Sequence, residues 1–307
     1  MPDGRTSRIA GLSAARRPDS LRTALERKHV EGHAGCARSH RVFESDGLRI
    51  SDIVCTAGPR DRPYEEAQGL ASIAIVLSGT FSYRGDYGRV LMTPGSLLLG
   101  NAGRCFSCGH EHGEGDHCVA FFFEPHLLER IAADSGVRRT SFPTHRLPFT
   151  RATAPLIARA TNALAEMRSA PAMSSALEEI GVGLASTVLT AHHEARLPRF
   201  TASDERRVTE VVRHMESTLD DAHSLLALSK QAGLSPYHFL RVFRKLTGVS
   251  PHQLLLRMRL NAAAHRLRHG SEPVTDVAYG VGFEDLSNFV RTFRAEFGAP
   301  PSRYRSG

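Results

Sequence analysis

The amino-acid sequence predicts an α+β protein of more than one domain. From Leu48 to Pro125 the chain contains short β-branched and aromatic runs separated by Gly, Pro, Asn and Asp. This texture is typical of an antiparallel sandwich or barrel. After Pro125 the apolar residues recur with the period of a helix. A chain of 307 residues is long enough for two domains with separate hydrophobic cores.

The amino-acid composition excludes only a few classes of protein. The hydrophobic fraction of 41% and the charged fraction of 23% are those of an ordinary globular protein. Residues 1–45 carry scattered arginines without an apolar stretch, so we expect no secretory signal and a cytoplasmic protein with no membrane partner. The net charge of +7 is concentrated at the two ends of the chain. It suits a polyanionic partner and equally a solvated basic surface.

We expect four segments along the chain. Residues 1–45 are rich in Arg, Ser, Ala and Gly, which predicts a disordered tail with one short helix around LRTALERKH. Residues 46–130 form the β domain. Residues 131–200 form a helical connector that serves either as a dimerisation region or as a cover for the β domain, and they end in a Pro-containing linker. Residues 201–307 are helical in period throughout.

A repeat in the last hundred residues points to the function. HFLRVFRKLTGVSP (238–251) matches NFVRTFRAEFGAPP (288–301), so one supersecondary unit occurs twice. Each copy follows a short apolar-periodic helix and a turn at Gly233 or Gly282, and the next helix starts near a Ser or Asp. A short helix, a tight Gly-bearing turn and a capped second helix are the features of a helix-turn-helix.

The second helix of each unit has two faces. Phe239 and Phe243 in one copy, and Phe289 and Phe293 in the other, are four residues apart and should face a core. The opposite face carries side chains that can read base edges, such as Arg for guanine and Asn for adenine. A helical bundle with a basic face is the alternative, but the duplication with arginine at matching positions favours binding to double-stranded DNA.

These residues resemble the DNA-binding domain of the AraC/XylS family of bacterial transcription regulators. The resemblance covers about residues 205–305, and AYGVGFEDLSNFVRTFRAEFG is close to the family signature. It implies seven helices, with a linker helix from Pro251 to Arg268 that holds both recognition helices in successive major grooves about 34 Å apart. It also implies a non-enzymatic regulator, in most members an activator that contacts RNA polymerase.

The resemblance and the helix faces together give the candidate contact residues. The candidates for reading bases are Tyr237, His238, Leu240, Arg241, Leu286, Ser287, Asn288 and Arg291. The candidates for phosphate contacts are Ser235, Arg244, Lys245, Thr292 and Arg294. Because Leu240 and Leu286 are apolar, they favour thymine-methyl contacts over hydrogen bonds.

The β-rich part resembles the cupin-like sensor barrel of the same family. IVLSGTFSYRGDYGRVLMTPGSLLLG reads as a strand, a hairpin and a further strand. The strand before Gly79 contains no histidine, so an enzyme-type cupin metal centre is not expected. The resemblance implies an effector whose identity the sequence does not give.

The stretch CFSCGHEHGEGDHC holds three of the five cysteines of the chain. The candidate sensor residues are Cys105, Cys108, His110, His112, His117 and Cys118. Three interpretations stay open: a hairpin loop flanked by small core cysteines, a metal sensor, and a thiol redox sensor. No cofactor is assigned, although a metal on this cluster is an alternative. The rival functions are a metal-dependent cupin enzyme fused to a DNA-binding domain, and a constitutive DNA binder with a scaffold β domain.

Overall fold

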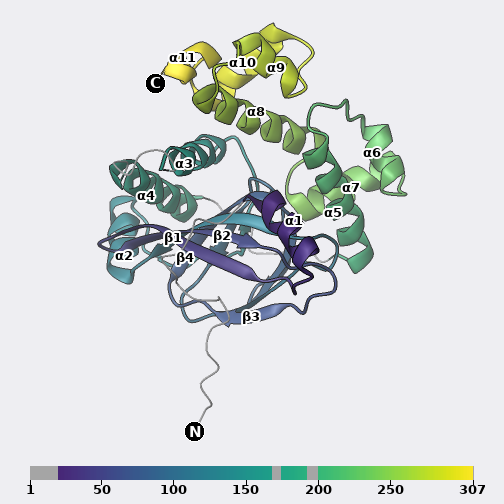
Figure 1. The fold of residues 1–307 in the computed structure, drawn as a ribbon. Helices are drawn as coiled ribbons and strands as arrows, with labels where there is room; N and C mark the ends of the chain where they lie inside the picture. Colours follow the sequence, from purple (N-terminus) through teal and green to yellow (C-terminus); the bar gives the residue numbers. More distant parts are fainter. Residues whose placement is uncertain (1–19, 168–173, 192–199, 307) are drawn as a thin grey trace.

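The computed structural model describes residues 20–167, 174–191 and 200–306 of the chain. Figure 1 shows a β domain with helices packed beside it and a C-terminal group of helices that extends away from it. The predicted fold class, antiparallel β-sheets plus an all-α domain, is confirmed.

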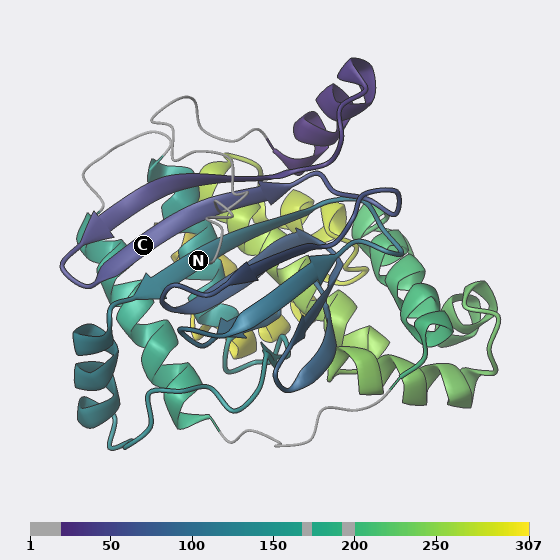
Figure 2. The same cartoon turned by 90° about the horizontal axis from the view of Figure 1, so that it is seen from below.

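The β domain consists of two antiparallel sheets. The six-stranded sheet has the order β1-β2-β9-β4-β7-β10, and the four-stranded sheet has the order β3-β8-β5-β6. The strands of the first sheet are β1 (Ala37–Ser45), β2 (Leu48–Cys55), β9 (Asp116–Phe123), β4 (Ala71–Gly79), β7 (Leu97–Gly100) and β10 (Arg146–Leu147). Those of the second are β3 (Tyr64–Ala67), β8 (Cys105–Gly109), β5 (Phe81–Gly85) and β6 (Gly88–Met92). Figure 2 shows the strands in front of the helices.

The central strands of the six-stranded sheet are buried on both faces, and their successive side chains point to opposite sides. On β9, Phe121 and Phe123 belong to the main hydrophobic core, which the sheet shares with helices. Ala120 and Phe122 line a cavity on the other side. The helices that contribute to this core include α2 (Pro125–Asp134), α3 (Ala154–Met167) and α4 (Ser174–Thr190).

Helix α4 approaches the sheet closely at a glycine. A Cβ atom on Gly181 would lie 2.7 Å from a methyl carbon of Leu48 and 3.5 Å from the ring of Phe121. Leu177 and Leu184 of the same helix are fully buried in the shared core. The connector helices therefore cover the β domain, which is one of the two roles predicted for them.

The predicted disordered tail over residues 1–45 is wrong from Ala37 onward, where the structure has a strand. Residues 1–19 lie outside the described part of the chain, and α1 (Leu21–Glu31) matches the expected short helix. Strand β1, however, pairs with β2 over its full length. A strand pairs through its backbone, so the polar, half-exposed sequence ARSHRVFES can form an edge strand without an apolar run. The β domain thus begins at Ala37 and not at residue 46.

The connector is otherwise close to the prediction. Helix α2 ends at Asp134, and Gly136 follows it at a φ of +70°. Strand β10 is an addition: it pairs with β7 and ties the connector to the six-stranded sheet. Most of the predicted linker, residues 192–199, lies outside the described part of the chain.

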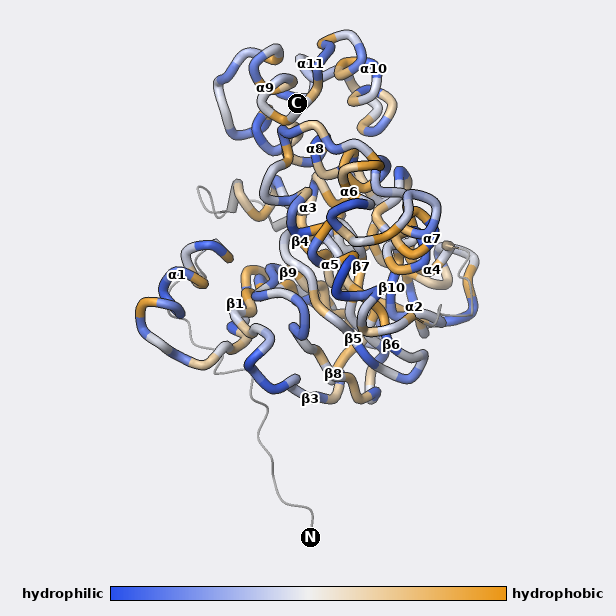
Figure 3. The backbone as a smooth tube through the Cα atoms, turned by 90° about the vertical axis from the view of Figure 1, so that its right-hand side faces the viewer, coloured by the Kyte–Doolittle hydropathy of each residue, from blue (hydrophilic) through white to orange (hydrophobic). Residues whose placement is uncertain are grey.

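The C-terminal part is all helical. Its helices are α5 (Ala202–Ser217), α6 (Leu225–Gln231), α7 (Pro236–Thr247), α8 (Pro251–His269), α9 (Val274–Gly280), α10 (Leu286–Phe297) and α11 (Pro301–Ser306). The two helix-turn-helix units are α6–α7 and α9–α10, with Gly233 (φ +64°) and Gly282 (φ +87°) in their turns as predicted. Figure 3 shows α9, α10 and α11 beyond α8, at the end of the molecule away from the strands. None of the described helices is long and apolar enough to cross a membrane.

The close approach at Gly181 gives a stability prediction. Replacing Gly181 by Leu should lower the free energy of unfolding by about 1–3 kcal/mol, because the added side chain overpacks the contact with Leu48. Urea denaturation measures this change. Val182 directly follows Gly181 on the same helix and is 42% exposed. Val182→Leu is therefore the control, and its free energy of unfolding should stay near the wild-type value. Equal effects of the two substitutions would contradict the packing of α4 described above.

Candidate nucleic-acid interface

Helices α7 and α10 each bury one aromatic face. Phe239, Phe243, Phe289 and Phe293 are all 0% exposed. In each helix the two ring centroids lie 5.5 Å apart, at the spacing of residues four apart. The core residues predicted from the repeat are therefore confirmed.

The same local chemistry starts and ends both helices. The Ser235 side chain accepts a hydrogen bond from the His238 N–H (3.4 Å), and the Asp285 carboxylate accepts one from the Asn288 N–H (2.6 Å). Such caps satisfy N–H groups that have no partner inside the helix. Both helices end at a glycine in the left-handed conformation, Gly248 and Gly298. Glycine is favoured there because it has no Cβ atom to oppose a positive φ. Ser235, a predicted phosphate contact, thus also has a capping role.

Helix α7 exposes most of the predicted contact residues. The Tyr237 side chain is 79% exposed. The cationic residues on the same exposed surface are Arg241, Arg244 and Lys245. His238 and Leu240 are half-buried, at the margin between this surface and the core. The exposed surface therefore combines one large aromatic ring with positive charge.

Helix α10 shows a matching arrangement. Ser287, Asn288, Arg291 and Arg294 are exposed, whereas Leu286 and Thr292 are half-buried. The Arg291 guanidinium donates to the Asn288 amide oxygen at 3.1 Å, and the Thr292 hydroxyl donates to the same oxygen at 3.3 Å. These bonds hold Asn288 and Arg291 side by side on the exposed face.

Helix α8 holds the two units at one separation. Its first half contributes Leu254, Leu255 and Met258 to the core shared with α7. Its second half contributes Leu260 and Leu267 to a separate core shared with α9 and α10. Because one continuous helix belongs to both cores, the two exposed faces keep a constant distance from each other.

The comparisons with known proteins agree with this geometry. Residues 228–307 match the model of a helix-turn-helix domain. The chain is 31% identical to the multiple antibiotic resistance protein MarA of Escherichia coli (strain K12) over 103 residues, which cover 34% of this chain and 81% of MarA. The chain belongs to the AraC/XylS family of transcription regulators.

Other AraC/XylS relatives are matched over a smaller share of their length. The HTH-type transcriptional activator RhaS of Citrobacter koseri is 32% identical over 152 residues, which cover 50% of this chain and 52% of RhaS. The chain therefore spans about half the length of that relative. An AraC-type transcriptional regulator from Chromobacterium violaceum has a solved structure with 26% identity and a TM-score of 0.32, which covers 34% of this chain and 95% of that one.

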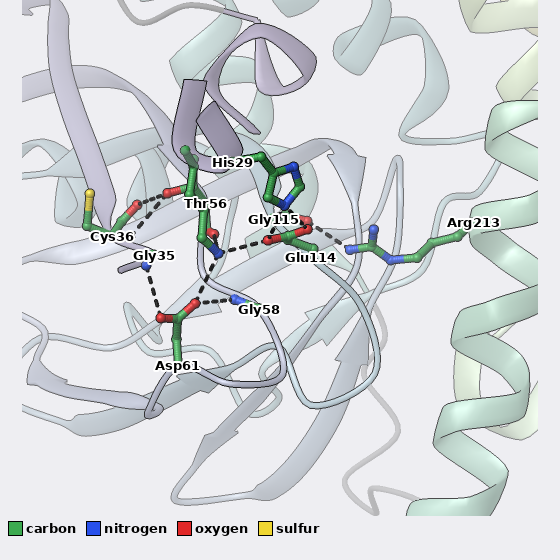
Figure 4. A network of polar contacts seen from close by, with 10 residues as sticks. His29, Gly35, Cys36, Thr56, Gly58, Asp61, Glu114, Gly115 and Arg213 are labelled. Carbon is green, nitrogen blue, oxygen red and sulfur yellow. Dashed lines mark hydrogen bonds and ion pairs between the residues drawn. The ribbon is translucent and has the colours of Figure 1, made fainter. Parts of the chain in front are cut away.

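Helix α5 joins the AraC/XylS helices to the β domain through charged side chains. The Arg213 guanidinium donates to the Thr80 hydroxyl and to the Gly115 carbonyl, both at 3.0 Å. The Glu216 carboxylate accepts a bond from the Gly79 N–H at 3.1 Å. Figure 4 shows Arg213 reaching from α5 toward Gly115. Burial lowers the pKa of Arg213 and raises the pKa of Glu216 above its ordinary value.

Two further arginines join the β domain and connector to the helix-turn-helix units. The half-buried Arg146 guanidinium donates to the carbonyl of Leu91 on β6 (3.0 Å) and to the carbonyl of Leu246 on α7. Burial lowers the pKa of Arg146 to about 10. Arg151 of the connector donates to the Ala295 carbonyl on α10. The sequence carries no signal for these contacts, because an arginine in a loop usually lies on the surface.

The structure brings together only part of the predicted sensor set. Cys105 is exposed, whereas Cys108, three residues along β8, is buried. His110 and Cys118 are buried beside Asp116, and His112 is half-buried. His117 bonds Asp52 at 2.5 Å on the opposite face of β9 from Cys118. The six residues do not share one site.

Cys55 is the member that sequence reasoning missed. Its thiol lies with donor atoms of His110 and Asp116 in a group whose members are all within 4.8 Å of one another. Cys55 stands about fifty residues earlier in the chain, at the end of β2, where it pairs with Asp116 of β9. An isolated cysteine ending an apolar strand gives no sign of such a neighbour.

A cavity of about 420 Å³ lies between the two sheets. Ile53 and Phe122 from the first sheet and Phe81 and Phe106 from the second line it. Its wall also includes Cys55, Cys108, Asp116 and Cys118. Burial raises the pKa of the Cys108 thiol to about 12 and also raises those of Cys55 and Cys118. Protonated thiols are poor nucleophiles, which disfavours the redox interpretation for these three.

The raised pKa of Glu216 predicts a pH dependence of stability. At a pH between its ordinary and its folded-state pKa, the folded protein binds more protons than the unfolded chain, so stability falls as pH rises through that window. In the Glu216→Gln variant the amide oxygen can still accept from Gly79, but the titration is removed. The loss of unfolding free energy between pH 5 and pH 7 should therefore be smaller than in the wild type.

Urea denaturation at the two pH values tests this expectation. Glu210 lies on the same helix, where it is exposed and paired with Arg206, so Glu210→Gln is the matched control. If Glu216→Gln kept the full wild-type pH dependence, the buried character of the α5 contact would be wrong.

Proposed function

We propose that this protein is a sequence-specific DNA-binding transcription regulator without enzymatic activity, and that it acts as an activator. The observation that carries the proposal is the pair of exposed, similarly capped helices α7 and α10 on one continuous helix α8. A pair of this kind suits two successive major grooves on one side of a duplex. Double-stranded promoter DNA is the proposed partner.

The exposed side chains fit distinct parts of the duplex. Arg241 and Arg291 have the bidentate geometry for guanine, and Asn288 has that for adenine. Asn288 and Arg291 lie side by side on the exposed face, and the Asn288 amide oxygen would exchange its bonds to Arg291 and Thr292 for one to adenine on binding. We assign the half-buried Leu240 and Leu286 to thymine methyl groups, and the exposed Arg244, Lys245 and Arg294 to phosphates.

Activation requires contact with the transcription machinery. RhaS is described as a transcriptional activator, which supports activation and contact with RNA polymerase here. The cavity between the sheets is within the usual range of small-molecule sites and mainly apolar, so we propose it as the effector site. If the regulator is a homodimer, its interface has to use a face other than the apolar faces of α3 and α4, because these are covered within the chain.

The proposed readers predict a specific loss of DNA affinity. Arg241→Ala and Arg291→Ala should each weaken binding by about 1–3 kcal/mol and relax the base preference at one position. A target sequence is first selected from a random duplex pool with the wild-type protein, and affinities are then measured by fluorescence anisotropy. Arg104 is exposed on the β domain, so Arg104→Ala is the control and should bind as the wild type does.

Salt dependence separates base contacts from phosphate contacts. Wild-type affinity should fall steeply with salt, and Arg244→Ala should reduce the slope of log K against log salt by about one. A pool that yields no enriched motif, or an Arg241→Ala protein with unchanged base preference, would contradict the proposed function.

A further inference from the structure

A buried group of metal-ligand side chains lies beside the strand ends that α5 contacts. Cys55 ends β2, Asp116 begins β9, and His110 directly follows β8. All three are buried, and their donor atoms lie within 4.8 Å of one another. Three separate segments of the chain thus converge on one point of the β domain.

A second thiol, that of Cys118, lies beside this group of three and contacts Asp116. The Cys118 thiol donates to one Asp116 oxygen at 3.2 Å, while a His110 ring nitrogen bonds the other oxygen at 2.6 Å. Cys55 and Cys118 stand on neighbouring strands at positions two residues apart in register, so they face the same side of the sheet. Cys108 is buried nearby, but its thiol is hydrogen-bonded with the Tyr64 hydroxyl.

The polar atoms of this group are poorly satisfied by the protein alone. His110 is 5% exposed, and its Nδ1 atom has no hydrogen-bond partner among the described residues. Asp116 is also 5% exposed; one of its oxygens bonds the His110 ring, and the other accepts from the Cys118 thiol, which is a weak donor. A buried carboxylate is costly unless a cation or strong donors compensate it. Cysteines that only fill a core would need neither the histidine nor the carboxylate.

We propose that Cys55, His110, Asp116 and Cys118 form a binding site for a thiophilic divalent metal ion, with Zn²⁺ as the matching ion. Two sulfurs, one imidazole nitrogen and one carboxylate oxygen are the ligand types of a tetrahedral zinc site. Ligand bonds of about 2.0–2.3 Å place the donor atoms of such a site about 3.3–3.8 Å apart. Cys55, His110 and Asp116 would therefore have to close in from separations of up to 4.8 Å, and the Cys118 thiol would have to turn toward them. On binding, the two thiols release their protons to solvent and neutral His110 supplies a lone pair.

The charge of the occupied site suits its location. Zn²⁺ with two thiolates and one carboxylate carries one net negative charge. The neighbouring residue Gly115 accepts its hydrogen bond from the Arg213 guanidinium, which places a positive charge next to the site. The buried site and the α5 contact would therefore stabilise each other electrostatically.

Binding of the ion would also fix both ends of the segment from His110 to Asp116. The middle of this segment contacts two helices: Glu114 pairs with Lys28 of α1 at 2.8 Å, and Gly115 contacts Arg213 of α5. Figure 4 shows Glu114 beside His29 of α1, and Arg213 reaching toward Gly115 from α5. Resting on the proposed function, we infer that metal occupancy sets how firmly α5 is held and hence how α7 and α10 are presented to DNA.

The first experiment measures metal binding by the full chain without DNA. Protein without a histidine tag is stripped with chelator and titrated with Co²⁺, and Zn²⁺ is then added in competition. We expect one ion per chain, a thiolate-to-cobalt charge-transfer band and tetrahedral d–d absorption, all displaced by Zn²⁺. A wild-type protein that binds no ion, or binds Co²⁺ without thiolate absorption, overturns the proposal, and this measurement requires no variant to fold.

Variants then assign the ligands. Cys55→Ser, His110→Gln and Cys118→Ser should each weaken Zn²⁺ binding at least tenfold. Cys105→Ser is the exposed control and Cys108→Ser is the buried control, and both should bind as the wild type does. Circular dichroism and urea denaturation establish that each variant is folded. Folded Cys55→Ser or His110→Gln protein with wild-type affinity would overturn the assignment.

The coupling to α5 has its own readout. Hydrogen–deuterium exchange of residues 205–217 should slow when Zn²⁺ is added to the wild type and stay unchanged in Cys55→Ser. Zn²⁺ binding without any change in this exchange would overturn the coupling and leave a structural metal site. Because none of these measurements contains DNA, failure of the proposed DNA-binding function would be seen separately.

Discussion

The contact between α5 and the strand ends of the β domain positions the rest of the C-terminal half. Arg213 bonds a hydroxyl and a carbonyl of the β domain, and Glu216 bonds the backbone N–H of Gly79. Hydrogen bonds between charged groups and backbone are directional and costly to break when partly buried. Together with Arg146, which joins β6 to α7, they hold the first helix-turn-helix unit in one orientation. Helix α8 then carries that orientation to the second unit.

The six-stranded sheet connects the helices to the cavity through the alternation of its side chains. Phe121 of β9 belongs to the core shared with α4, while its neighbours Ala120 and Phe122 face the cavity. The first residue of the same strand, Asp116, follows directly on Gly115, which contacts α5. Strand β9 therefore lies between the cavity on one side and the core shared with α4 on the other, and its first residue adjoins the contact with α5. Close packing leaves little room for such a change to be absorbed locally.

The helix-turn-helix units were predictable because their determinants are local. The apolar period, the turn glycines, the capping Ser235 and Asp285, and the paired phenylalanines all lie within about twenty-five consecutive residues of each unit. Because the unit occurs twice, each copy supported the assignment of the other. The family resemblance then assigned base contacts to positions on the exposed faces. Strand β1 escaped prediction because an edge strand needs only backbone partners, and its polar side chains resemble those of a tail.

The sequence by itself determined the fold class, the two helix-turn-helix units and the residues on their exposed faces, because helices and turns are encoded by neighbours along the chain. Only the tertiary structure decided which cysteines and histidines meet. It separated Cys105 and His117 from the group and added Cys55, since strand pairing brings residues together that are far apart in sequence. It also decided that α5 is held by Arg213 and Glu216, because burial of a charged side chain depends on the surface that packs against it.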